Sequence, residues 1–228
     1  HTYINNMYID PFDETKECFA DKWGLVSLAK MGHEVTLICG GNKKEKRKEY
    51  LWKGIKVIEL PPLFEFNNTS RLLHGFISEL MKIDADIFHT HHYCSLIPEI
   101  TAIVGKWRRI PVTLTFHNSF MEGDFLARNL GRLYLLLMQP ILHFYSKCFF
   151  ISHYLKTKFL FSFGRNKTVI YNYVGLPDSM SIERENNSIL YVGRLTHQKG
   201  VDILIRAVSS VKSQYPSIKL YLMGDGDK

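Results

Sequence analysis

Short apolar strands alternate with amphipathic helical segments along almost the whole chain, and this alternation is the strongest constraint on its fold. Apolar residues recur every three or four positions, as in a helix, over residues 17–30, 70–82, 96–107 and 124–145. Apolar runs typical of buried strands cover residues 35–39, 55–58, 86–89, 111–116, 148–151 and 168–171. Because a helix between two strands lets them run in the same direction, the pattern predicts an α/β fold with parallel, Rossmann-like sheets.

A polar segment near residue 178 divides the chain. Residues 178–188 contain only two apolar side chains, Met180 and Ile182, which is typical of a linker between domains. We therefore predict one Rossmann-like domain in residues 1–178 and the start of a second in residues 179–228, truncated after one strand–helix–strand unit. His1-Thr-Tyr looks like the last residues of a largely missing first strand, and the other end stops inside a glycine-rich turn, so we expect a fragment.

The charge balance favours anionic partners. The 228 residues carry a formal net charge of +7, which suits nucleotides, acidic lipid headgroups or nucleic acid. No DNA- or RNA-recognition motif is present, so nucleic acid is not an expected partner. The four cysteines are widely spaced and form no Cys-x-x-Cys pair, which favours reduced core thiols and a cytoplasmic protein.

A candidate diphosphate site follows the strand at residues 189–192. Gly193 ends this strand, the cations Arg194 and Lys199 follow, and Asp202 is expected to cap the next helix. Backbone N–H groups and the positive helix end converge at such a turn, and Arg and Lys supply charge suited to phosphate oxygens. The alternative is that both cations are merely solvated.

A second glycine turn strengthens this interpretation. The strand at residues 219–223 ends at Gly224-Asp-Gly226, and the ends of two parallel strands lie at the same edge of a sheet. Glycine at these positions lets a phosphate or base approach the backbone closely. We see no pair of carboxylates placed to hold Mg²⁺, so neither a metal nor a cofactor is expected.

Histidines mark the ends of two strands in the first domain. His117 follows the strand at residues 111–116, and either caps it or faces a ligand. His89, His91 and His92 follow the strand at residues 86–89, where residues 89 and 91 share a face and residue 92 points away. They therefore form no chelating triad; we expect His89 in the core and His91 or His92 beside a ligand.

A basic loop is the remaining charged feature. It contains five cations, which are either solvated or in contact with an anionic membrane: Lys43, Lys44, Lys46, Arg47 and Lys48. The apolar run at residues 133–151 is interrupted by Gln139, Pro140, His143 and Lys147, so we expect a buried helix and strand there and no membrane span.

Taken in order, these motifs resemble the retaining glycosyltransferases of family 4, which have the two-domain GT-B fold. The resemblance rests on Gly193-Arg-Leu, Lys199-Gly-Val-Asp and Gly224-Asp-Gly, and on four segments of the first domain: Met31-Gly-His-Glu-Val-Thr-Leu, Asp86-Ile-Phe-His-Thr-His-His-Tyr, Pro111-Val-Thr-Leu-Thr-Phe-His and Ile170-Tyr-Asn-Tyr-Val-Gly-Leu. Three features depart from the family pattern. Tyr173 replaces a glycine, and no Gly-Gly pair occurs in residues 5–14. The family's Glu-x7-Glu motif is expected well beyond residue 228 and is absent, so half of the nucleotide pocket should be missing and this chain alone inactive.

The resemblance implies transfer of a hexose from a nucleoside-diphosphate sugar to a glycan or lipid-linked acceptor, with retention. The implied roles are diphosphate binding by Gly193, Arg194, Lys199, Gly224 and Gly226, a catalytic position near the sugar for His117, and acceptor contacts by His91, His92 and Asn118. His117 would then lie across a cleft from the diphosphate site. Two alternatives stay open: a GT-B nucleotide-sugar epimerase, or a non-catalytic relative that binds nucleotide or glycan. The expected location is the cytoplasm, with peripheral contact to the cytoplasmic membrane face through the basic loop.

Overall fold

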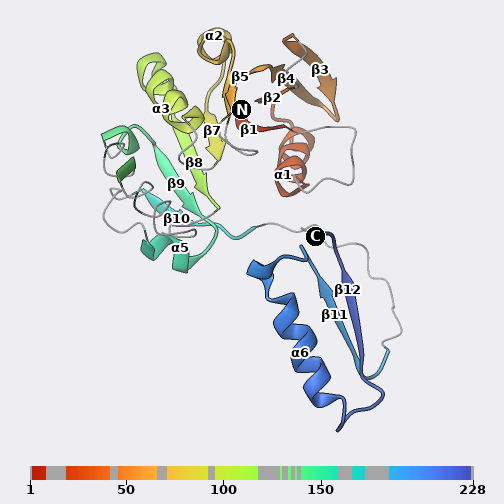
Figure 1. Ribbon diagram of the computed structural model, residues 1–228. Coiled ribbons are helices and arrows are strands. Elements are labelled where there is room, and N and C mark those ends of the chain that lie inside the picture. The colour runs from red at the N-terminus through yellow and green to blue at the C-terminus, as the bar shows by residue number, and fades with distance from the viewer. Residues whose placement is uncertain are drawn as a thin grey trace. The chain divides into compact units, whose positions relative to one another are not determined.

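A computed structural model describes residues 2–8, 19–41, 46–65, 71–91, 96–117, 129, 133–134, 137, 140–158, 166–172 and 185–226. The chain separates into two compact units, His1–Gly175 and Leu176–Lys228, where the sequence places a boundary near residue 178. Figure 1 shows their helices and strands. Most of the predicted linker at residues 178–188 and of the predicted helix at residues 124–145 lies outside the described residues.

The first unit is built on an eight-stranded sheet with the order β10-β9-β8-β7-β1-β2-β4-β3 (Figure 1). Its strands are β1 (Thr2–Tyr8), β2 (Val35–Gly40), β3 (Lys48–Trp52), β4 (Ile55–Leu60), β7 (Phe88–His91), β8 (Val112–Phe116), β9 (Lys147–Phe150) and β10 (Lys167–Val169). All neighbouring pairs are parallel except β3 with β4. The chain adds strands on one side of β1 and later on the other, as in doubly wound folds.

The first strand extends further along the chain than the sequence predicted. β1 is seven residues long and lies in the middle of the sheet. Its residues Thr2 to Ile4 pair with Thr36 to Ile38 of β2 and with Phe88 to Thr90 of β7. Pairing with both neighbours ends at Ile4, and after a register irregularity Tyr8 pairs with Gly40 of β2. Asn5 and Asn6, which interrupt the apolar pattern, lie in this irregular part of the strand.

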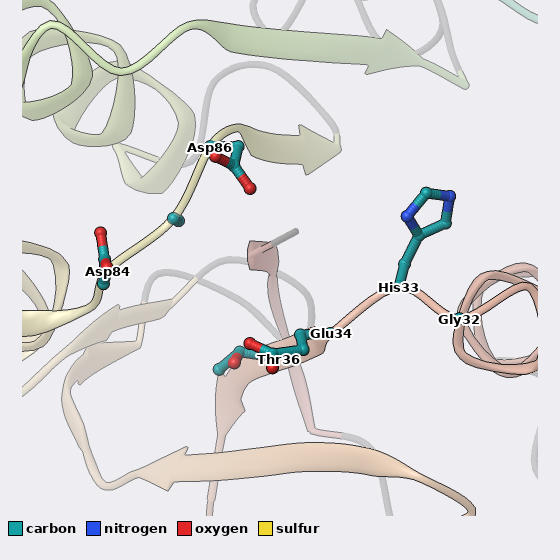
Figure 2. Close-up of a pocket in the computed structure, with 7 residues that line it drawn as sticks. Gly32, His33, Glu34, Thr36, Asp84 and Asp86 are labelled. Carbon is teal, nitrogen blue, oxygen red and sulfur yellow. The ribbon is translucent and has the colours of Figure 1, made fainter.

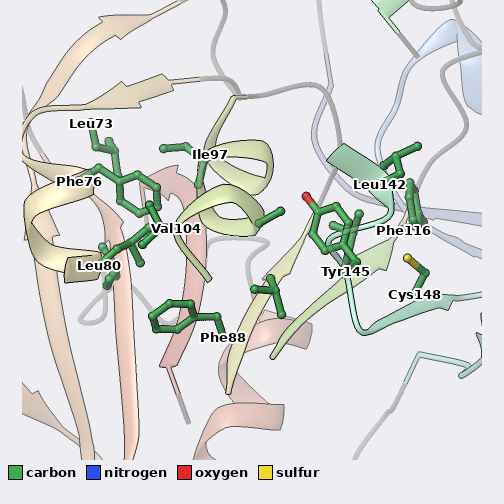
Figure 3. Close-up of a cluster of buried hydrophobic side chains, with 14 of the residues drawn as sticks. Leu73, Phe76, Leu80, Phe88, Ile97, Val104, Phe116, Leu142, Tyr145 and Cys148 are labelled. Atoms are coloured by element: carbon green, nitrogen blue, oxygen red, sulfur yellow. The ribbon is translucent and has the colours of Figure 1, made fainter. Parts of the chain in front are cut away.

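Helices α1 (Phe19–Lys30), α2 (Phe76–Lys82), α3 (Ile97–Arg108) and α5 (His153–Lys158) belong to the same unit. Figure 3 shows side chains of α2 and α3 gathered with strand residues in the main core, among them Phe76, Leu80 and Phe88, each at most 2% exposed. Burying a side chain of this size stabilises a fold by about 1.5–3 kcal/mol. A second cluster packs Leu25 and Val26 of α1 against β2 and β4.

Glycine decides how closely α3 approaches the sheet. A Cβ atom at Gly105 would lie 2.2 Å from Val112 Cγ2 and 3.0 Å from the carbonyl oxygen of Ile110. Real Cβ atoms do not approach other atoms so closely, so a larger residue would push the helix away from β8. The position of α3 matters because this helix connects β7 to β8, and His91 and His117 lie at the ends of these two strands.

Two local predictions for this unit were wrong. Residues 48–52, where the basic loop ends, form the antiparallel strand β3, joined to β4 by a tight turn at Lys53-Gly54 with φ values of 47° and 80°. Residues 71–73, predicted as helix, form strand β6 (Arg71–Leu73), which pairs with β5 (Pro62–Glu65) in a separate two-stranded sheet. Gly75, with a φ of 75°, turns the chain so that α2 begins only at Phe76.

Two findings bear on the expected cellular context. Cys39 and Cys148 are buried free thiols, and burial raises the pKa of Cys148 to about 12, while Cys18 and Cys94 lie outside the described residues. Among the helices that the structure describes, none is both long and apolar enough to cross a membrane.

The second unit contains one strand–helix–strand element. β11 (Ser188–Val192) and β12 (Lys219–Met223) pair in parallel, with Ser188 opposite Lys219 and Val192 opposite Met223. Between them lie a short 3-10 helix, η1 (His197–Lys199), and helix α6 (Val201–Val211). Both strands and the parallel pairing are as predicted.

An ion pair ties the β3–β4 hairpin to α2. Arg47 donates two hydrogen bonds to Glu79, from Nε to Oε1 at 2.7 Å and from Nη2 to Oε2 at 3.2 Å. The same Nη2 lies 2.6 Å from Oε2 of Glu49. The Glu79 side chain is only 10% exposed, so its charge depends on this partner. Arg47, predicted to lie in a solvated or membrane-facing loop, is exposed and also pairs with Glu79.

Replacing Arg47 should therefore destabilise the first unit. We expect Arg47→Met to lower the free energy of unfolding by about 1–3 kcal/mol, because it leaves the Glu79 carboxylate half-desolvated without its hydrogen bonds. Urea unfolding followed by tryptophan fluorescence measures this, since Trp23, Trp52 and Trp107 all belong to the first unit. Exposed Lys46→Met is the matched control and should change stability by at most ~0.5 kcal/mol. Equal effects of the two variants would contradict a structural role for the pair.

Candidate functional site

The two glycine turns of the second unit lie against each other. The Gly193 N–H donates to the Met223 carbonyl at 3.0 Å, and the Leu195 N–H donates to the Asp225 carbonyl at 2.8 Å. A Cβ atom at Gly224 would lie 1.8 Å from the carbonyl oxygen of Gly193, and one at Gly226 would lie 2.1 Å from that of Leu195. The segments after β11 and β12 therefore form one compact backbone surface, which only glycine permits.

Tyr191 supports this surface, and the sequence analysis did not select it. Its hydroxyl donates to the backbone carbonyl of Arg194 at 2.8 Å. The same hydroxyl would lie 2.9 Å from a Cβ atom at Gly193, so the tyrosine packs across the glycine. This tyrosine holds the backbone from which the Arg194 side chain projects. The sequence offered one indication of this role: Tyr191 is a polar-tipped side chain near the carboxyl end of an apolar strand.

The two predicted cations project from this turn. Arg194 follows Gly193, Lys199 ends η1, and both side chains are exposed. Gly200, with a φ of 66°, then leads into α6. An exposed guanidinium and an exposed ammonium can donate hydrogen bonds to phosphate oxygens.

The prediction that Asp202 caps this helix was wrong. α6 begins at Val201 with Gly200 at the N-cap position, and Asp202 lies inside the first turn. Its carboxylate accepts a hydrogen bond from Arg206 Nη2 at 2.6 Å, four residues along the same exposed helix face. The left-handed backbone of Gly200, which the residue pattern does not reveal, moved the start of the helix by two positions.

Substituting Gly224 tests the close packing of the turns. We expect Gly224→Ala to force the turns apart and to accelerate hydrogen exchange at the Gly193 and Leu195 amides by about 10- to 100-fold, a loss of about 1–3 kcal/mol. Nuclear magnetic resonance of the chain measures both amides. Gly24→Ala in α1 is the control, since nothing lies within 4 Å of a Cβ atom there. Unchanged exchange in Gly224→Ala would show that the turns do not depend on glycine.

Three histidines gather in the first unit where β7 and β8 end. Parallel pairing places His89 opposite Thr113 and His91 opposite Thr115, and His117 follows directly after β8. Thr90 and His91 thus belong to β7, where the sequence predicted a loop. His92 and Asn118, two of the predicted acceptor residues, lie outside the described residues.

His89, predicted to lie in the core, is half-buried, whereas His91 is the buried member of the group. Its Nδ1 lies 2.7 Å from Thr113 Oγ1 and its Nε2 lies 3.1 Å from Thr115 Oγ1. The sequence analysis missed both threonines, although the alternation in Val112 to Phe116 places them on one face of the strand. Burial, and secondarily the charge of His117, lowers the pKa of His89 from 6.5 to about 4.

His91 and His117 are in direct contact. His91 Nδ1 lies 2.6 Å from His117 Nε2, and the ring centroids are 4.9 Å apart with 25° between the planes. His91 is 8% exposed, whereas His117 is half-buried. The structure therefore brings one predicted acceptor residue, His91, together with the predicted catalytic residue. In the described ranges no group of three or more His, Cys, Asp or Glu side chains is arranged to hold a metal ion.

The pKa of His89 should make stability depend on pH. Its folded-state pKa lies below the unfolded value, so the unfolded chain binds the proton more readily, and stability present above about pH 6.5 is lost as pH falls towards 4. We expect His89 to account for a loss of roughly 2 kcal/mol between pH 8 and pH 5. Urea unfolding of His89→Gln and His89→Leu should lack this component, and only the glutamine should preserve stability at pH 8. Wild-type pH dependence in both variants would refute the assignment.

A polar pocket lies at the opposite edge of the sheet (Figure 2). Its volume is about 370 Å³ and it is lined by Gly32, His33, Glu34, Thr36, Asp84, Ala85 and Asp86. These residues precede or begin β2 and β7, whereas the histidines lie where the strands end. Three carboxylates at its wall would repel a diphosphate, so the pocket is unsuited to an anionic donor.

Comparison with known proteins places the chain in a family. Residues 26–176 match Glycosyltransferase Family 4, and residues 177–228 match Glycosyl transferases group 1. The parallel sheets with helices between their strands define an α/β protein with Rossmann-like topology. The chain belongs to Glycosyltransferase Family 4.

Several individual relatives are similar along most of this chain. The gpi3 subunit of phosphatidylinositol N-acetylglucosaminyltransferase from Schizosaccharomyces pombe is 21% identical, over 88% of this chain and 46% of the relative. Phosphatidyl-myo-inositol mannosyltransferase from Mycolicibacterium smegmatis is 22% identical, over 88% of this chain and 53% of the relative. The chain thus spans about half the length of these curated relatives.

Solved structures share the fold. A trehalose-6-phosphate synthase superposes with a TM-score of 0.66 at 14% identity, over 99% of this chain and 64% of that structure. Anabaena HepE in complex with UDP has a TM-score of 0.63 at 16% identity, over 99% of this chain and 61% of that structure. These likenesses establish an α/β fold of the GT-B type.

Proposed function

We propose that this protein is a glycosyltransferase that moves a hexose from a nucleoside-diphosphate sugar to a lipid-linked or glycan acceptor, with retention of configuration. Membership of Glycosyltransferase Family 4 supports sugar transfer. Two structurally similar proteins contain UDP or UDP-2-fluoro glucose, which supports a nucleotide-sugar donor. The donor is a substrate, and the proposal requires neither a metal nor a cofactor.

The observation that carries the proposal is the pair of interlocked glycine turns with Arg194 and Lys199 exposed beside them. When a sugar leaves a nucleoside diphosphate, negative charge grows on the departing phosphate. Cations held at that position stabilise the transition state more than the ground state. Arg194 and Lys199 are assigned this role, and Gly193, Gly224 and Gly226 provide the backbone surface against which the donor binds.

The acceptor side is assigned to the histidine edge of the first unit. His117 would hydrogen-bond the donor sugar or the acceptor hydroxyl, with His91 beside it and His92 and Asn118 following in the chain. The names of the yeast and mycobacterial relatives combine a sugar with a phosphatidylinositol acceptor, which supports a lipid acceptor here. The protein would then work at the cytoplasmic face of a membrane. Of the basic loop, Lys43 and Lys44 lie outside the described residues. Lys46, Arg47 and Lys48 are exposed, and Arg47 is paired with Glu79.

Arg194→Ala and Lys199→Ala test the diphosphate site. Each variant should bind UDP or GDP about 10-fold or more weakly, since a charge-assisted hydrogen bond contributes about 1.5–3 kcal/mol. Isothermal titration calorimetry measures the affinity. Lys212→Ala, an exposed cation just after α6, is the matched control and should keep wild-type affinity. Unchanged affinity in both test variants would remove the role assigned to them.

A donor screen separates the proposed activity from its alternatives. Released nucleoside diphosphate that depends on an added acceptor supports transfer. Hydrolysis or epimerisation of the donor without an acceptor supports an epimerase, and tight nucleotide binding without turnover supports a binding protein. The anomeric configuration of the product tests retention.

A further inference from the structure

The contact between His91 and His117 has the geometry of a hydrogen bond between two rings. The nitrogens are 2.6 Å apart and the ring centroids 4.9 Å apart. The difference equals the distance from each ring centroid to its own nitrogen, counted once for each ring, so the two centroids and the two nitrogens lie almost on one line. The rings therefore meet edge to edge, with the planes tilted by only 25°. Two nitrogens this close require a proton between them, donated by one ring to the lone pair of the other.

Such a bond determines what His117 can do next. A neutral imidazole has two nitrogens, one a donor and the other an acceptor. Because His91 engages Nε2 of His117, any hydrogen bond from His117 to a substrate goes through Nδ1. The donor or acceptor character of Nδ1 is then set by the direction of the proton in the His91–His117 bond.

The surroundings keep His91 in place. It is the last residue of β7, it is 8% exposed, and its ring lies edge-on to His89 with centroids 4.7 Å apart. His89 is in turn held by Thr113 and Thr115 of β8 and lies over the Phe149 ring of β9 at 6.2 Å. A buried ring on a central strand thus supports a half-buried ring at the end of the next strand.

We propose that His91 is a positioning residue for His117: it orients the His117 ring, occupies Nε2, and sets the tautomer that Nδ1 presents to substrate. The catalytic part of this inference rests on the proposed sugar transfer. It differs from the acceptor contact first expected of His91, because here His91 acts on His117 and not on the acceptor.

Three substitutions of His91 distinguish positioning from a merely structural role. In His91→Asn the side-chain amide reaches the place of Nδ1, in His91→Gln it reaches the place of Nε2, and His91→Phe keeps a ring without nitrogens. We expect His91→Phe and His91→Gln to lower kcat by about 10- to 100-fold with little change in the KM for the donor, because a displaced His117 affects the reacting geometry. His91→Asn should restore activity to within a few-fold of wild type.

A spectroscopic measurement tests the bond without relying on activity. In protein labelled with ¹⁵N-histidine, the wild type should show a nitrogen–nitrogen coupling across the hydrogen bond between His91 Nδ1 and His117 Nε2. His91→Phe should lose this coupling and change the ¹⁵N shifts of His117, while tryptophan fluorescence confirms that the unit is folded. Absence of the coupling in the wild type, or unchanged His117 shifts in His91→Phe, overturns the inference whatever the activity.

The remaining outcomes separate the inference from the proposed function. If the coupling is present and His91→Phe keeps the wild-type kcat, sugar transfer stands and the positioning role is wrong. If the full-length wild type turns over no donor with any acceptor, the proposed function fails, and the catalytic part of the inference fails with it. A nitrogen–nitrogen coupling in the wild type, together with a higher kcat in His91→Asn than in His91→Gln, supports both the positioning role and sugar transfer.

Discussion

The parallel pairing of strands in register is the constraint on which the rest of the structure depends. β1 lies between β2 and β7, and β8 continues the same direction, so the ends of these strands share one edge of the sheet. Side chains 26 residues apart in the chain, His91 and His117, meet at this edge within hydrogen-bonding distance. A shift of one residue in the β7–β8 register would place the threonines of β8 on the face opposite to the histidines.

In the second unit, parallel pairing brings backbone segments together in the same way. β11 and β12 are parallel and in register, so the turns after them leave the sheet side by side. The separation is so small that a single added carbon at Gly224 would overlap the backbone of Gly193. This proximity produces a compact surface of peptide groups directly before Leu195, and the proposed diphosphate site is built on that surface.

The cations of the chain serve different purposes, although they look alike in the sequence. Arg47 neutralises a largely buried carboxylate on α2 and contributes to packing. Arg206 pairs with Asp202 along the exposed face of α6. Arg194 and Lys199 project from the glycine turns and remain exposed. The role proposed for them depends on the backbone that carries them, because a charge stabilises a leaving group best from a fixed position.

The sequence by itself determined the fold class, the strands that carry the site and the residue types at their ends. Apolar residues that recur every two positions indicate a strand, and those that recur every three to four indicate a helix. Because this pattern can be read from neighbouring residues alone, the bounds of β8, β11, β12 and α3 were predicted to within one or two residues. The tertiary structure alone decided the length of β1, the antiparallel β3, the start of α2 and α6, and the capture of Arg47 by Glu79. It also decided that His91 touches His117, and that Thr113 and Thr115 hold His89. Each of these depends on hydrogen bonds between residues far apart in the chain or on a left-handed glycine, and neither leaves a periodic pattern in the residues themselves.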